Sequence, residues 1–347
     1  MKLNEKFISK VKNILVVGKN NQVGDMICSL PLYAALKKRF PLANITLVAA
    51  KTNYPIPIKK INPHIDRVLI LDRSTLKSSI NFLRELRKIK YQIGIVPSTI
   101  TISSTSHIIN FLSGAKLRVG VRSIDGEKNK NSYLLNVKND FNWGDLKKHQ
   151  RDRNLDVVEQ IGCYFTTEEL KNIKINIDNQ SYSFIEEFIT KKFPDKSKLI
   201  IGLHPGAGKK PNIWDTEKFK LLIKKLNEKY QPYFLITVGS TDTDVIKNLS
   251  TYLNGNNILF STDEKMKINE LAALLKKISI YITNDTGPMH IANSAGAKIL
   301  ALFGPNKSYE WGPTGINSVS IQSSTDDINK ITVDEVFQKS IALLNNK

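Results

Sequence analysis

Short apolar runs of strand length alternate with segments of helical periodicity along this chain, and the alternation occurs twice. The first half opens on Asn13-Ile14-Leu15-Val16-Val17-Gly18, and a helical pattern follows from Gly24 to Arg39. The second half opens on Leu199 to Leu203, with a helical pattern from Thr216 to Lys229. Continuous apolar runs are typical of parallel strands covered by helices on both faces. The pattern predicts an α/β fold with two Rossmann-like, doubly wound parallel-sheet domains.

The length of the chain also indicates two domains. At 347 residues it exceeds the roughly 250–300 residues at which single hydrophobic cores stop growing. We expect an N-terminal domain over residues 1–175 and a C-terminal domain over residues 176–330. The tail, residues 331–347, has the spacing of one amphipathic helix.

The net charge of +19 limits the classes of partner. The lysines are spread along the chain, and no segment interleaves basic with aromatic residues as single-strand binders do. We therefore expect no nucleic-acid partner. Two explanations of the charge stay open: a general bias of composition towards Lys, Asn and Ile, and peripheral attraction to an anionic inner membrane.

The sequence predicts a cytoplasmic protein. No run of about 18 apolar residues is present, and the basic N-terminus lacks the apolar core and the cleavage site of a secretory signal. The two cysteines, Cys28 and Cys163, fit no metal or disulfide spacing and are expected to be reduced thiols.

Candidate functional residues lie in the strand-to-helix turns, because doubly wound sheets bind ligands at the carboxyl ends of their strands. The first candidate is Asp25, at the start of the first helix. A carboxylate there can cap the helix. Alternatively, it faces the crevice between the two halves and accepts a proton from a sugar hydroxyl.

Two turns in the second half predict a diphosphate site. Small residues in the first turn let backbone N–H groups approach an anion and a lysine adds charge, although the same run also fits an ordinary turn. The second turn leads into a helix with Pro288 in its first turn, where its missing N–H costs nothing, and the free N–H groups and the helix dipole suit phosphate. The two runs are His204-Pro205-Gly206-Ala207-Gly208-Lys209-Lys210 and Thr283-Asn284-Asp285-Thr286-Gly287-Pro288-Met289-His290.

A third turn, Gly239-Ser240-Thr241-Asp242-Thr243-Asp244, contains an Asp-x-Asp pattern. Carboxylates at this spacing fit a metal, a ribose or a helix cap. Because helix N-termini and lysine already supply positive charge to a phosphate site, we predict that no metal is required. The second half thus offers a nucleotide-diphosphate site and the first half a base, which is the division of labour of a two-domain sugar transferase.

The sequence at these turns resembles glycosyltransferase family 9, the ADP-heptose lipopolysaccharide heptosyltransferases. The two strongest matches are HPGAGK at His204 to Lys209 and NDTGPMHIA at Asn284 to Ala292. Further matches lie along nearly the whole chain, at Ile14 to Val17, Val23 to Asp25, Leu30 to Leu36, His149 to Gly162, Ala301 to Pro305 and Trp311 to Pro313.

The resemblance implies a GT-B fold whose two domains face a central cleft, with the acceptor on the N-terminal domain, the nucleotide sugar on the C-terminal one and a tail helix that crosses back to the N-terminal domain. The implied reaction is inverting transfer of a heptose from ADP-heptose to a lipopolysaccharide core acceptor, without cofactor. Asp25 would be the catalytic base. With the turns above, the candidate donor site is His204, Gly206, Gly208, Lys209, Asp242, Asp285, Thr286, Gly287 and His290.

This chain departs from the family pattern in two places. The segment Asn212-Ile213-Trp214-Asp215 lacks the basic residue that many members carry before the tryptophan, which leaves open whether Lys209 or Lys210 holds the phosphates. Asp242 and Asp244 both lie near the position of the acidic residue that contacts the ribose. Two rival functions stay open: an enzyme for another nucleotide sugar, including an epimerase, and a basic binding protein without catalysis.

Overall fold

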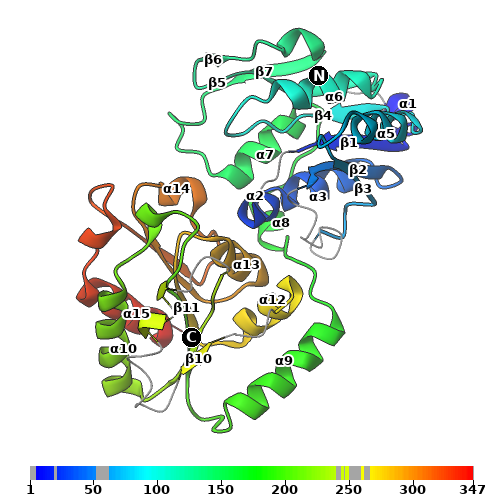
Figure 1. Ribbon diagram of the computed structural model, residues 1–347. Coiled ribbons are helices and arrows are strands. Elements are labelled where there is room, and N and C mark those ends of the chain that lie inside the picture. The colour runs from blue at the N-terminus through cyan, green and yellow to red at the C-terminus, as the bar shows by residue number, and fades with distance from the viewer. Residues whose placement is uncertain are drawn as a thin grey trace. The chain divides into compact units, whose positions relative to one another are not determined.

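The computed structural model describes residues 5–18, 22–51, 62–239, 244–245, 247–249, 259–261 and 266–346. The chain divides into two compact units, Met1–Ile173 and Lys174–Lys347, whose elements are labelled in Figure 1. The first unit ends at residue 173, where the sequence predicted 175, and the second unit includes the tail.

The N-terminal unit is built on a sheet with the strand order β3-β2-β1-β4-β5, and β6 and β7 both pair with β5. Its strands are β1 (Asn13–Val17), β2 (Asn44–Ala50), β3 (Arg67–Leu71), β4 (Ile93–Ile95), β5 (Leu117–Ile124), β6 (Glu127–Lys128) and β7 (Val137–Phe141). The pairing of β5 with β6 is antiparallel, so this sheet is mixed where the sequence predicted a parallel one. Asp125 and Gly126 join the two strands with positive φ angles of 49° and 85°, a conformation that allows a tight reversal.

The helices of this unit cover both faces of the sheet. They are α1 (Glu5–Ile8), α2 (Val23–Cys28), α3 (Leu30–Arg39), α5 (Leu76–Arg87), α6 (Ser104–Leu112), α7 (Gln150–Glu159) and α8 (Thr167–Lys171), with the 3-10 turn η2 (Ser132–Leu134). Phe82 and Leu86 of α5 and Ile109 of α6 join one core cluster with Leu15 and Val17 of β1. Because the strand order reverses beside β1, right-handed crossovers place α3 on the opposite face, where it packs against α7.

The helix predicted from Gly24 to Arg39 is interrupted at Ser29, with α2 before it and α3 after it. Pro31 stands in the first turn of α3, and it has no backbone N–H to bond back into α2. The Ser29 hydroxyl donates instead to the Met26 carbonyl at 2.8 Å. Asp25 consequently lies in a separate six-residue helix that directly follows the first strand.

The C-terminal unit is built on a parallel sheet with the order β10-β9-β8-β11-β12-β13. Its strands are β8 (Ile200–His204), β9 (Tyr233–Ile236), β10 (Leu259–Ser261), β11 (Ile280–Asn284), β12 (Ile299–Phe303) and β13 (Ser318–Gln322). Its helices are α9 (Asn179–Lys192), α10 (Thr216–Tyr230), α12 (Ile268–Lys277), α13 (Gly287–Ala295), α14 (Ser308–Trp311) and α15 (Val333–Asn345), with the 3-10 turns η3 (Lys210–Asn212) and η4 (Ile328–Lys330).

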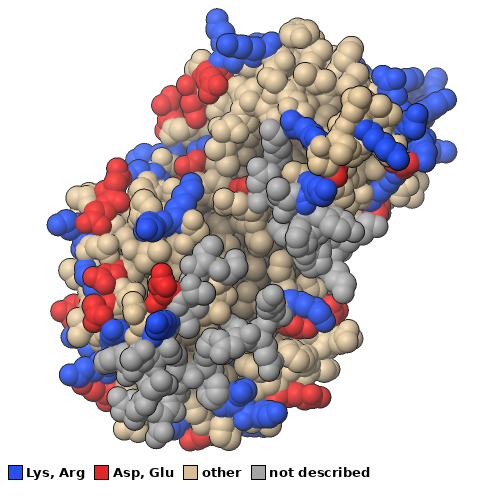
Figure 2. Space-filling model, viewed as in Figure 1, with Lys and Arg blue, Asp and Glu red and all other residues tan. Residues whose placement is uncertain are grey.

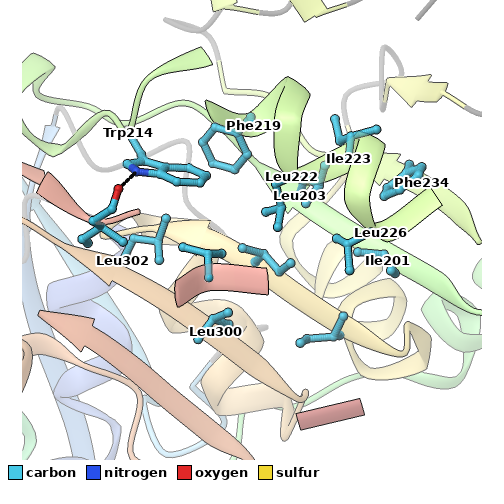
Figure 3. Close-up of a cluster of buried hydrophobic side chains, with 14 of the residues drawn as sticks. Ile201, Leu203, Trp214, Phe219, Leu222, Ile223, Leu226, Phe234, Leu300 and Leu302 are labelled. Carbon is cyan, nitrogen blue, oxygen red and sulfur yellow. Dashed lines mark hydrogen bonds between the residues drawn. The ribbon is translucent and has the colours of Figure 1, made fainter. Parts of the chain in front are cut away.

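The core of the C-terminal unit lies between its sheet and the pair α10 and α15. Figure 3 shows the buried side chains of α10 above those of the sheet, with Trp214 at one end. The Trp214 indole is fully buried, meets the Phe219 ring edge-on at 4.9 Å and donates from Nε1 to the Ile331 carbonyl at 3.0 Å. α15 buries Val336 and Leu343 in this core.

A buried histidine of α6, His107, anchors the segment that follows β6. His107 is fully buried; its Nδ1 lies 2.8 Å from the Ser103 carbonyl and its Nε2 2.9 Å from the Asn129 amide nitrogen. The carbonyl requires a proton on Nδ1, so Nε2 accepts from Asn129. Burial lowers the pKa of His107 from its usual 6.5, against a smaller raising effect of the Ser103 hydrogen bond. The neutral ring is therefore the form that fits this site.

We expect His107→Ala to lower the free energy of unfolding by about 1–3 kcal/mol, because the buried Asn129 amide loses an acceptor. Since the folded pKa lies below the unfolded one, the stabilising effect of His107 is fully present above pH 6.5 and declines as the pH falls below it. Urea unfolding above and below pH 6.5 measures both effects. An unchanged pH dependence in the variant would contradict the assignment of the neutral ring.

Both cysteines are buried free thiols. Burial raises the pKa of Cys163 to about 12, so this thiol stays protonated and chemically inert at neutral pH. Among the described residues, the helices are all too short or too polar to cross a membrane.

Candidate functional site

The two turns that the sequence predicts as a phosphate site follow neighbouring strands of the second sheet. β8 lies between β9 and β11, so the strand order reverses between β8 and β11. Thr283 of β11 pairs in register with His204 of β8. In doubly wound sheets a crevice for ligands opens at this reversal. The turns after His204 and after Asn284 therefore lie side by side at the place where the fold provides a binding site.

Asn284 fixes one turn to the other. Its side chain is fully buried, and Nδ2 donates to the carbonyls of Pro205 at 2.8 Å and Gly206 at 3.2 Å. Its Oδ1 accepts from the backbone N–H of Trp214 at 3.3 Å. Because the Trp214 indole is itself anchored in the core, the shape of the segment after β8 is determined by the fold before any ligand binds.

The second turn leads into α13, which begins at the same edge of the sheet, directly after β11. Thr286 is the N-cap, with extended backbone angles of φ −149° and ψ 168°, and Gly287 and Pro288 begin the helix. The first turn of a helix leaves N–H groups without intrahelical acceptors, and the helix dipole makes this end positive. The arrangement can bind the phosphates of a ligand.

Asp285 is held between three strand ends. Its Oδ2 accepts from Asn306 Nδ2 at 2.6 Å and from Asn212 Nδ2 at 3.4 Å. Asn306 follows β12 and Asn212 follows β8, so amides from both neighbouring strands hold the carboxylate that follows β11. Burial raises the pKa of Asp285, while the Asn306 hydrogen bond and the charge of Lys209 lower it.

The two candidate lysines occupy different surroundings. Both are exposed, but Lys209 lies near enough to Asp285 for its charge to lower the pKa of that carboxyl group, whereas Lys210 begins the 3-10 turn η3. In the same segment Gly206 is buried and Gly208 is exposed. A Cβ placed on Gly208 would meet no described atom within 4 Å, so the backbone there is open to a ligand.

The two candidate histidines are both buried inside the C-terminal unit. His204 is buried, with Nδ1 3.0 Å from both the carbonyl and the hydroxyl oxygen of Thr237. His290 is also buried, with its ring edge-on to Trp311 at 6.1 Å between centroids. Both rings are thus packed inside the C-terminal unit, and their contact with a donor stays a prediction. Asp242 lies outside the described residues, and Asp244 is exposed.

The N-terminal unit places Asp25 at its own strand reversal. β1 lies between β2 and β4, and Asp25 is the third residue of α2, the helix that follows β1. The carboxylate is half-buried in a helix that packs against α3 and α7. Each unit therefore carries its candidate residues where its fold provides a binding edge.

A cavity of about 310 Å³ also opens at the carboxyl ends of β1, β2 and β3. Its polar lining comes from Lys51, Arg73, Thr105 and Ser106. Lys51 forms an ion pair with Asp72 at 2.8 Å, and this hydrogen bond, followed by those from Ser74, lowers the pKa of Asp72 to about 2. Two cations and two hydroxyl groups around an apolar floor suit a sugar with an anionic substituent.

Reasoning from sequence does not single out Asn212, Asn284 or Asn306 as functional residues. Each of the three follows or ends a strand of the second sheet, at its carboxyl edge, and that position is the signal by which they could have been found. Their partners lie 21 to 79 residues away, so no local pattern reveals the contacts.

Comparison with known proteins identifies the family of this chain. Residues 80–340 match the model of glycosyltransferase family 9 (heptosyltransferase). The lipooligosaccharide heptosyltransferase 2 of Haemophilus influenzae is 25% identical over 334 residues, which cover 92% of this chain and 91% of the relative. That of Campylobacter jejuni strain 81116 is 25% identical over 183 residues, which are 52% of this chain and only 56% of the relative.

The same fold occurs among solved structures. The Escherichia coli ADP-heptose lipopolysaccharide heptosyltransferase II superposes with a TM-score of 0.74 at 19% identity, covering 96% of this chain and 98% of that one. Two doubly wound units in one chain, with their candidate residues at the strand reversals, thus correspond to the GT-B fold. Because the family match spans most of its length, the chain belongs to glycosyltransferase family 9, the heptosyltransferase family.

Proposed function

We propose that this protein is an inverting, metal-independent glycosyltransferase that moves a heptose from ADP-heptose to a core sugar of lipopolysaccharide. The observation that carries the proposal is the site around Asp285. A carboxylate held by two amides lies next to a helix N-terminus and a lysine, which together suit a sugar joined to a diphosphate. The names of the relatives, lipooligosaccharide heptosyltransferase 2 and ADP-heptose lipopolysaccharide heptosyltransferase, support the choice of donor and acceptor.

On this proposal the C-terminal unit binds the donor. The first-turn N–H groups of α13 and the ammonium group of Lys209 stabilise the diphosphate as its negative charge develops. Because Asp285 Oδ2 takes both amide hydrogen bonds, Oδ1 is the oxygen that accepts from a hydroxyl of the donor sugar. Positive charge from the helix and the lysine is the basis for proposing that no metal is needed.

The N-terminal unit binds the acceptor and supplies the base. The acceptor hydroxyl attacks the anomeric carbon from the side opposite the diphosphate, a new C–O bond forms as the bond to phosphate breaks, and Asp25 takes the hydroxyl proton. ADP leaves, and the anomeric centre is inverted. The cavity with Lys51 and Arg73 would hold an anionic substituent of the acceptor. We place the reaction in the cytoplasm, at the surface of the inner membrane.

A donor screen tests this function. The protein is incubated with truncated lipopolysaccharide and with ADP-heptose, UDP-sugars or GDP-sugars in turn, with a chelator present. We expect release of ADP and a gain of one heptose in the mass of the acceptor, only with ADP-heptose. Turnover of another nucleotide sugar, or epimerisation without transfer, would replace the proposed substrate, and loss of turnover with the chelator would refute metal independence.

A further inference from the structure

The outer surfaces of α5 and α6 form one continuous face of the N-terminal unit. Both helices pack on the same side of the sheet through one core cluster. Arg87 of α5 donates from Nε to the carbonyl of Leu112, the last residue of α6, at 3.2 Å. Because this hydrogen bond joins the two helices directly, their outward residues belong to one surface, which we call the α5/α6 face.

Large apolar side chains are exposed on this face. Leu76 and Ile80 of α5 are 79% and 41% exposed, and Ile108 and Phe111 of α6 are 47% and 49% exposed. Spacings of four and three residues place each pair on one side of its helix. Single exposed apolar residues are common, but two aligned pairs on neighbouring helices make a patch that calls for a partner.

The same face is strongly cationic. Lys77, Arg84 and Arg87 lie on α5, Lys88 is its C-cap, and Lys116 and Arg118 follow α6. Glu85 is the acidic residue of α5, and it is neutralised by ion pairs with Arg67 and Lys88. Figure 2 shows Lys and Arg side chains gathered over the region of α1 and α5.

Three cations of this face are available to a partner. In the part of the chain that the structure describes, the side chains of Lys77, Arg84 and Lys116 form no ion pair. Arg118 is partly exposed and donates from its guanidinium to the carbonyls of Leu134 and Ala115, with its guanidinium carbon 5.5 Å from the centre of the exposed Phe111 ring. On α10 in the other unit, two lysines are ion-paired: Lys220 pairs with Glu217, and Lys225 with Asp334.

An anionic bilayer matches both properties of the face. Apolar side chains enter the boundary between head groups and acyl chains, while cations beside them bind lipid phosphates. Nucleic acid would use the cations but gain little from the exposed aliphatic side chains. A second copy docked by twofold symmetry would bring like charges together.

The cavity in the N-terminal unit lies beside the α5/α6 face and links that face to acceptor binding. Arg73, just before α5, and Thr105 and Ser106, in the first turn of α6, line the 310 Å³ cavity. The cavity thus lies at the margin of the α5/α6 face. We infer that the α5/α6 face docks on an anionic phospholipid membrane, which brings the cavity to the head groups of a membrane-anchored acceptor. The role of the acceptor in this inference rests on the proposed function; the docking itself does not.

Vesicle co-sedimentation of the full chain without donor or acceptor tests the docking. One set of vesicles contains phosphatidylcholine alone, and the other contains equal parts of phosphatidylcholine and phosphatidylglycerol. We expect the protein to bind the anionic vesicles and to bind the neutral ones much more weakly. Each cation near an anionic surface adds about fivefold to partitioning, so a Lys77→Gln, Arg84→Gln variant should bind roughly 25-fold more weakly.

Matched variants separate the face from the net charge. Lys191→Gln, Lys224→Gln removes the same charge from exposed positions on α9 and α10 and should bind like the parent. Leu76→Ser, Ile108→Ser should weaken binding in low and high salt alike, because it removes the apolar part. Circular dichroism of each variant checks that the fold is retained.

Several outcomes would overturn the inference. The first is that the parent protein binds neutral and anionic vesicles equally. The second is that the two charge variants lose vesicle binding to the same extent. The third is that the protein forms a dimer that does not bind vesicles and that only the variants of the α5/α6 face disrupt. Because no transfer is measured, failure to bind leaves the proposed reaction untouched, and failure of the reaction leaves the docking result valid.

Discussion

Replacing Asp25 with asparagine is expected to reduce transfer by about 10² to 10⁴-fold, the range that a positioned general base contributes. Asparagine keeps the size of the side chain but cannot take the proton of the acceptor hydroxyl. Donor binding should stay close to that of the parent, because the residues proposed to hold the diphosphate lie in the other unit. Single-turnover kinetics with ADP-heptose gives the rate, and calorimetric titration with ADP gives the affinity.

Glu168→Gln provides the matched control for this prediction. Glu168 is an acidic residue in the first turn of α8, in the same unit, and pairs with Lys171 on the protein surface. Its neutralisation should leave both the rate and the affinity unchanged. If Asp25→Asn weakened ADP binding by the same factor as it slowed transfer, Asp25 would be part of donor binding and the assignment as base would be lost.

The fold was largely predictable because its signals are local. Apolar runs such as Ile14 to Val17 and Ile280 to Ile282 are buried on both sides, which only a covered parallel sheet provides. The prediction of one helix from Gly24 to Arg39 was wrong because helical spacing continues across the break at Ser29. Apolar periodicity records which side is buried, and it does not record where a backbone hydrogen bond is missing.

The candidate site was predictable in its turns but not in its contacts. Glycines, prolines and lysines mark 204–210 and 283–290 as places where a phosphate can bind. The amides that organise those turns are brought there by pairing of distant strands, and Asn306 reaches Asp285 across 21 residues of sequence. The burial of His204 and His290 likewise follows from tertiary packing against Thr237 and Trp311, for which a single sequence carries no periodic signal.

Asn306→Ala is expected to lower kcat/KM for the donor by roughly 10- to 100-fold, because a hydrogen bond to a charged group contributes about 1.5–3 kcal/mol. The variant loses the 2.6 Å hydrogen bond that holds Asp285 Oδ2. That bond also lowers the pKa of Asp285, against the raising effect of burial, so its removal raises the pKa further. Because the ionised carboxylate is the form that accepts from the donor sugar, activity is lost as the pH falls through this pKa. The acid limb of the pH–rate profile should therefore move to higher pH in the variant.

Asn212→Ala is the graded comparison, because the same carboxylate oxygen receives the Asn212 amide at the longer distance of 3.4 Å. It should move the acid limb in the same direction by a smaller amount. The two amides then act as positioning residues: they hold Asp285 in one place and one charge state without touching the reacting atoms. A fall in rate that is equal at every pH, with the acid limb unmoved, would mean that Asn306 only supports the turn after β12. The charge of Lys209, which also lowers the pKa of Asp285, would then be the main electrostatic influence on this carboxylate.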